Sequence, residues 1–192
     1  MGGLFSVLFN LVSVILGVAS VYALALLRVL CYNKNKEDVF HPKGATMNSD
    51  LMRQVSVTAR CAAAFRCDRL EPLGIRGPQY AMILRVCREP GITQEALSRA
   101  LCIHKSNIAR QVEKLEAAGF VTRQSDDGDR RLSRLYPTDA ARAVVPEILA
   151  ALRAWSAYLT AEMTPEEMEQ ITPLLEKIRL RAVAYFETGK ID

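Results

Sequence analysis

Residues 93–137 read TQEALSRALCIHKSNIARQVEKLEAAGFVTRQSDDGDRRLSRLYP, and this stretch decides the fold. It opens with Thr93, a favoured helix N-cap. The apolar positions that follow are spaced as on one helical face: Ala96, Leu97, Ala100 and Leu101. After an interruption at residues 102–104, a second apolar period comprises Ile108, Val112 and Leu115, and Gly119 is a stop signal. Two short helices separated by a tight turn predict a helix-turn-helix.

The second predicted helix carries polar side chains away from its apolar stripe. They are Ser106, Asn107, Arg110, Gln111 and Lys114. Arg pairs bidentately with guanine, Asn and Gln pair with adenine, and Ser and Lys hold phosphates. This face therefore has the chemistry of a recognition helix in a DNA major groove. A solvated polar face is the alternative that the pattern alone leaves open.

A charged hairpin is predicted directly after the two helices. Residues 120–123 and 132–136 favour strands, and residues 125–131 favour a turn. The turn ends in Asp129, Arg130 and Arg131, so the tip is basic. A basic hairpin that follows a helix-turn-helix is typical of a winged helix.

The order of these motifs resembles the MarR (multiple antibiotic resistance regulator) family. That family typically has a helix ending in Leu-Glu-x-x-Gly-hydrophobic-Val, and this chain has LEAAGFV at residues 115–121. A wing with an Asp-Arg-Arg element follows in both cases. The chain departs from the family where Tyr136 and Pro137 precede Thr138, so the resemblance leaves the start of the next helix open.

The resemblance covers roughly residue 47 to the C-terminus and implies both fold and function. The implied fold is mainly α, a winged helix-turn-helix whose terminal helices form a homodimer interface. The implied function is transcriptional regulation, as a repressor that binds a pseudo-palindromic operator in double-stranded DNA. In the family, the wing arginines enter the minor groove, which assigns Asp129, Arg130 and Arg131 to the DNA-binding set.

The flanking segments predict further helices with apolar stripes. Residues 49–70 form the first, residues 78–89 the second, and residues from 144 onward a long one that Pro146 either kinks or restarts. Thr164, Pro165 and Glu167 supply an N-cap, a first-turn Pro and a capping-box Glu for the last helix. The stripes of the first and last helices exceed what a small winged core buries, which favours a partner copy over a monomeric helical cap.

Residues 1–46 form an apolar leader and linker before a domain expected at 47–192. Residues 4–27 carry no charge and are long enough to span a bilayer. The leader is interpreted either as a mis-called start upstream of Met47 or as a transmembrane anchor. In the second case the following cations would keep the domain on the cytoplasmic side of the inner membrane. The expected location is the cytoplasm in the first case.

Catalytic chemistry is not predicted by this sequence. It has two histidines, no Gly-rich phosphate loop and no metal-ligand spacing, so no enzyme activity, metal or cofactor is expected. Five cysteines without close pairing suit a reducing compartment. Four of them raise the alternative of thiol-based redox sensing: Cys61, Cys67, Cys87 and Cys102.

A small aromatic or phenolic effector is the expected partner besides DNA. Candidate lining residues lie on the first two helices and the long one after the wing: Phe65, Arg66, Tyr80 and Trp155. The alternative is that these side chains belong to the core. Two further alternatives for the whole chain are a membrane-tethered regulator and a DNA-free winged helix that mediates protein contacts.

Overall fold

The structure, a computed structural model, describes residues 47–125 and 133–190. The chain divides into two compact units, Met1–Arg53 and Gln54–Asp192. Of the first unit only residues 47–53 are described, and there Arg53 pairs with Asp50 at 2.8 Å. The leader expected at residues 1–46 lies outside the described residues. In the described part of the chain, no helix combines the length and hydropathy that a membrane span requires.

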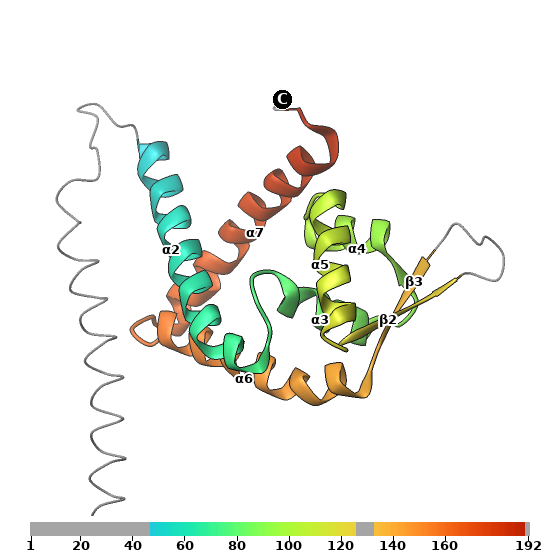
Figure 1. Ribbon diagram of the computed structural model, residues 1–192. Coiled ribbons are helices and arrows are strands. Elements are labelled where there is room, and N and C mark those ends of the chain that lie inside the picture. The colour runs from blue at the N-terminus through green and yellow to red at the C-terminus, as the bar shows by residue number, and fades with distance from the viewer. Residues whose placement is uncertain (1–46, 126–132, 191–192) are drawn as a thin grey trace, which may run out of the picture. The chain divides into compact units, whose positions relative to one another are not determined.

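The second unit is mainly helical with a small sheet, as predicted. The elements in order are α2 (Met47–Leu70, which begins in the first unit), the 3-10 turn η1 (Glu71–Leu73), α3 (Gln79–Arg88), β1 (Ile92–Thr93), α4 (Gln94–Leu101), α5 (Lys105–Ala117), β2 (Val121–Ser125), β3 (Ser133–Pro137), α6 (Asp139–Leu159) and α7 (Pro165–Thr188). In Figure 1, the hairpin of β2 and β3 projects from the group formed by α3, α4 and α5, and α6 leads away from it toward α7. This is the winged helix-turn-helix architecture.

Threonine caps fix the starts of three helices. The Thr93 hydroxyl accepts a hydrogen bond from the Ala96 amide at 3.2 Å, which confirms the predicted cap of α4. At α7, Thr164 and Glu167 form the predicted capping box, with each side chain bonded to the other residue's backbone amide. The Thr138 hydroxyl accepts from the Ala141 amide at 3.2 Å, so Thr138 is the N-cap and α6 begins at Asp139.

The structure departs from the sequence interpretation at two places. Residues 92 and 93 form a third strand, β1, which pairs antiparallel with β3 through Ile92 and Leu135, so the strand order is β1-β3-β2. α6 continues through Pro146 as one helix, so a new helix start there is wrong. Proline removes one backbone hydrogen bond from a helix interior. Burial of Ile148 and Ala151 further along the same helix stabilises it across this gap.

One apolar core lies beneath the helix-turn-helix and positions it. Its fully buried side chains come mainly from α3, α4, α5, both strands of the hairpin and α6, and they include Met82, Ile83, Leu97, Ile108, Leu115, Val121, Leu135 and Ile148. The predicted apolar period of α5 points into this core, and so do Ala96, Leu97 and Leu101 of α4. Ala100, which was predicted on the same face, is exposed. α3 packs against α6, β3 and α4, so it joins the helix-turn-helix to the sheet and to the long helix. The orientation of α5 is therefore fixed by packing rather than by its own polar contacts.

Candidate nucleic-acid interface

The turn between α4 and α5 is tight and internally bonded. Cys102 ends α4 in the left-handed conformation with φ 51°, and it is the only residue other than glycine with positive φ in the described chain. The Ser98 hydroxyl, nearly buried, donates to the Ile103 carbonyl at 2.6 Å. These contacts set the angle at which α5 leaves the turn.

α5 presents its polar side chains to solvent as expected. Its inner face buries Ile108, Val112 and Leu115. On the outer face, Ser106, Arg110 and Lys114 are exposed, and Asn107 and Gln111 are half-buried.

The outer side chains of α5 are linked to one another. Asn107 Oδ1 accepts from Arg110 Nη2 at 3.2 Å and lies 3.5 Å from Gln111 Nε2. Because the amide and guanidinium groups hold each other, they are partly oriented before any ligand arrives. Their donors and acceptors are the types that read base edges.

The start of α5 has charged contacts that sequence reasoning missed. Lys105, its first residue, donates to Glu95 on α4 at 2.8 Å, and Arg99 Nη1 lies 3.5 Å from the same carboxylate oxygen. The hydrogen bond from Lys105 is the main cause that holds the pKa of Glu95 below its usual range. Lys105 and Glu95 are ten residues apart, so only the geometry of the turn reveals their contact. The available sequence signal was a basic residue at the start of a helix.

The root of the hairpin is held to α5 and to the turn before β1. Arg123 Nε on β2 lies 3.0 Å from a Glu116 carboxylate oxygen on α5. On β3, Arg134 Nη1 donates to the Gly91 carbonyl at 3.1 Å. Gly91 has φ 86°, and a Cβ there would meet the Tyr136 hydroxyl at 3.2 Å, so glycine suits this approach. The expected wing residues Asp129, Arg130 and Arg131 lie outside the described residues.

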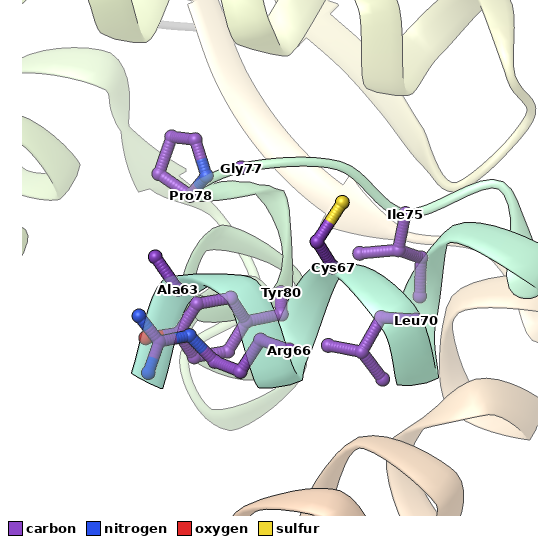
Figure 2. Close-up of a pocket in the computed structure, with 8 residues that line it drawn as sticks. All are labelled: Ala63, Arg66, Cys67, Leu70, Ile75, Gly77, Pro78 and Tyr80. Atoms are coloured by element: carbon purple, nitrogen blue, oxygen red, sulfur yellow. The ribbon is translucent and has the colours of Figure 1, made fainter. Parts of the chain in front are cut away.

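A second site is a cavity of about 400 Å³ between α2 and α3 (Figure 2). Its lining is mostly apolar and consists of Ala63, Arg66, Cys67, Leu70, Ile75, Gly77, Pro78 and Tyr80. The Arg66 guanidinium carbon lies 5.1 Å from the centre of the Tyr80 ring. The cavity therefore combines one cation, one phenol and an apolar wall.

The four candidate effector residues divide into two pairs. Arg66 and Tyr80 line the cavity, whereas Phe65 and Trp155 pack against each other with ring centres 5.1 Å apart. The Trp155 ring also stacks with the Tyr158 ring, with ring centres 5.8 Å apart. For Phe65 and Trp155 this arrangement matches the alternative of a packing role, since neither is among the lining residues.

The cysteines of the described chain form no disulfide. The Cys67 thiol donates to Glu71 at 3.4 Å, and this hydrogen bond is the main cause that raises the pKa of Cys67. Burial raises the pKa of the Cys87 thiol. A raised pKa reduces the thiolate fraction, which is the reactive form. Both thiols are therefore less reactive than an ordinary cysteine at neutral pH.

Comparison with known proteins gives one consistent result. Residues 73–132 match the model described as MarR family. The uncharacterized HTH-type transcriptional regulator YybA of Bacillus subtilis (strain 168) is 27% identical over 131 residues, which cover 68% of this chain and 87% of YybA.

Solved structures agree in fold over most of the chain. A MarR transcriptional regulator from Methanosarcina mazei Go1 is 30% identical, with a TM-score of 0.65, and the match covers 70% of this chain and 96% of that one. A MarR protein from Peptoclostridium difficile DA00132 is 26% identical, with a TM-score of 0.74 and coverage of 79% and 99%. The Methanosarcina mazei protein, like YybA, is described as a transcriptional regulator.

Proposed function

The chain belongs to the MarR family of DNA-binding transcriptional regulators, and from that premise we propose that it is a ligand-responsive repressor that binds a pseudo-palindromic operator as a homodimer. The observation that carries the proposal is the outer face of α5, where Asn107, Arg110 and Gln111 form one linked group. This group sits on a helix whose inner face is locked into the core.

We assign base reading to α5 and phosphate binding to its edges. Asn107, Arg110 and Gln111 have bidentate partners on adenine or guanine, whereas Ser106 and Lys114 suit the sugar-phosphate backbone. The hairpin would place Asp129, Arg130 and Arg131 beside the neighbouring minor groove, as the family resemblance implies. The ion pair between Glu116 and Arg123 supports this division because it ties the hairpin root to α5.

The homodimer is proposed from apolar side chains left exposed on the terminal helices. On α7 more than half of the side-chain surface is open at Leu174, Leu180 and Tyr185, and Tyr158 on α6 is 74% exposed. Large apolar surfaces of this kind mark interfaces between protein chains. A two-fold dimer also supplies two copies of α5, which must reach half-sites about 34–36 Å apart on one face of DNA.

The effector is proposed to be a small aromatic or phenolic acid that binds in the cavity between α2 and α3. Arg66 would pair with its carboxylate, and the apolar wall with Tyr80 would hold its ring. Because α2 also contributes to the proposed dimer interface, a ligand here can shift the spacing of the two α5 helices. The shift lowers operator affinity only by the ligand's preference for the DNA-free form.

Thiol sensing has weaker support than ligand binding. The pKa values of Cys67 and Cys87 are both raised, which opposes reaction with oxidants at neutral pH. We place the regulator in the cytoplasm, where its DNA partner is. A membrane-tethered form depends on residues 4–27, which lie outside the described residues.

A salt titration tests the proposal against a winged helix that binds only proteins. The full chain is titrated with random duplex between 50 and 200 mM salt, and sedimentation gives its mass. A homodimer whose DNA affinity falls by roughly 10³-fold or more over that range is expected if six or more phosphates are neutralised. A monomer, or a chain with no salt-dependent affinity for duplex, would contradict it.

A further inference from the structure

The first residue of α5 is a cation in an unfavourable place. Lys105 stands at the positive end of the helix macrodipole, and the first turn of α5 contains no acidic residue. The N-cap, His104, makes no side-chain capping hydrogen bond. A positive charge here destabilises an isolated helix by a small amount. An anion near the start of α5 would offset this effect.

Glu95 supplies an anion in the structure as it stands. Its carboxylate accepts from Lys105 Nζ at 2.8 Å and lies 3.5 Å from Arg99 Nη1. One carboxylate between two cations is the arrangement that a phosphate group would also adopt. All three side chains are more than half exposed, so a polyanion in solvent can reach them.

The position of this cluster follows from the proposed DNA interface. In helix-turn-helix proteins the N-terminal end of the recognition helix enters the major groove, and its flanks run beside the phosphates. Lys105 lies two residues before Asn107 and five residues before Arg110 on the same helix. A DNA phosphate beside the start of α5 would approach the ammonium group that Glu95 already holds, and the two anions would repel each other across it.

We propose that Glu95 is an exchangeable counter-anion for Lys105: it holds the ammonium group in free protein, yields it to a DNA phosphate, and so lowers DNA affinity without changing sequence preference. The proposal rests on the DNA-binding function proposed above. It makes Glu95 a positioning residue, which acts through Lys105 and touches no base. Phosphate contacts carry no direct sequence information, so the effect is the same on operator and random duplex.

The test compares neutral variants of three carboxylates in the full chain. Glu95→Gln removes the counter-anion. Glu187→Gln removes an equal charge from the same hollow of about 480 Å³, which Glu95, Arg99 and Lys105 also line. Glu71→Gln breaks an exposed pair of equal length, 2.8 Å to Arg76, on η1 away from α5. Mobility shifts with operator and random duplex are measured at several salt concentrations.

The expected result is specific to Glu95. Glu95→Gln raises affinity about two- to fivefold for both duplexes at low salt, the range for an exposed ion pair. The slope of log affinity against log salt becomes steeper by up to about 0.9, since Lys105 now meets a phosphate without releasing a carboxylate. Glu187→Gln and Glu71→Gln have smaller effects. When Lys105→Gln is already present, the effect of Glu95→Gln on DNA affinity falls to that of Glu187→Gln.

Three outcomes overturn the inference. Equal effects of Glu95→Gln and Glu187→Gln would mean that only net charge matters. A loss of affinity in Glu95→Gln, with an unchanged melting temperature, would mean that Glu95 holds Lys105 in its DNA-binding position. If wild-type protein shows no salt-dependent affinity for any duplex, the proposed function itself fails, and the inference fails with it.

Discussion

The carboxylate of Glu116 near the end of α5 lies 3.0 Å from Nε of Arg123 on β2, and this ion pair joins the recognition helix to the root of the wing. Less than a third of the Arg123 side chain is exposed, and its Nε and Nη2 are buried without an aligned hydrogen bond in the described chain. The contact is therefore mainly electrostatic. It couples the hairpin root to α5, the proposed recognition helix.

Glu116→Gln is expected to destabilise the fold and to weaken DNA binding without changing the preference for particular DNA sequences. A partly buried guanidinium loses its anion, which costs about 1–3 kcal/mol in unfolding free energy. Denaturant unfolding and mobility shifts on several duplexes measure the two effects. Glu113→Gln is the control, because Glu113 is exposed on the same helix and belongs to none of the ion pairs in the described part of the chain. An unchanged unfolding midpoint in Glu116→Gln would contradict the assigned role of the pair.

Cys102→Gly is expected to stabilise the protein. Cys102 holds φ 51°, a conformation that costs a residue with Cβ about 1–3 kcal/mol and costs glycine little. The greater conformational freedom of glycine in the unfolded chain offsets about 0.4–1 kcal/mol of this stabilisation. A rise of about 1 kcal/mol in unfolding free energy should remain. Cys61→Gly, in the interior of α2, should instead destabilise the protein. A lower unfolding free energy in both variants would contradict the proposed strain at Cys102.

Arg66→Gln is expected to weaken binding of an aromatic carboxylate in the cavity by about tenfold or more, since a hydrogen bond to a charged group is worth about 1.5–3 kcal/mol. The single tryptophan, Trp155, packs against Phe65, the residue before Arg66, so its fluorescence reports occupancy. Arg69→Gln is the matched control, because Arg69 lies over Phe65 at 5.4 Å and does not line this cavity. Equal affinity in wild type and Arg66→Gln would place the effector elsewhere.

A chain that begins at Met47 is expected to fold, dimerise and bind DNA as the full chain does. α2 begins at Met47, and the described core draws only on residues from position 62 onward. Circular dichroism, sedimentation and mobility shifts of the shortened chain check this. Loss of folding in the shortened chain, or recovery of the full chain in membrane fractions, would support an anchor in residues 1–46.

The helix boundaries were predictable because their signals are local. Thr93 and Thr164 cap their helices through side-chain contacts three residues away, and Gly119 adopts the positive φ that its stop role requires. The inner and outer faces of α5 also follow from periodicity alone. For these features the sequence carries the physical cause within one or two turns of chain.

The features that were missed depend on distant partners. β1 has only two residues, and its pairing with β3 joins positions about 40 residues apart. The contact of Lys105 with Glu95 and the cavity beside Arg66 exist only once the turn and the packing of α2 on α3 are set. Aromatic residues mark both cavities and cores, so sequence could not separate Tyr80 from Phe65 and Trp155.

The central claim, sequence-specific reading by α5 in a homodimer, is tested most directly by selecting duplexes from a random pool with the full chain. Wild type should enrich two inverted half-sites whose centres are about 10–10.5 base pairs apart or a multiple of that spacing. Asn107→Ala and Arg110→Ala should each relax the motif by about 1–3 kcal/mol at particular positions. Arg130→Ala and Arg131→Ala should weaken all sequences alike, and Arg153→Ala on α6 should match wild type. No enriched motif, or an unchanged one in both Asn107→Ala and Arg110→Ala, would contradict the account.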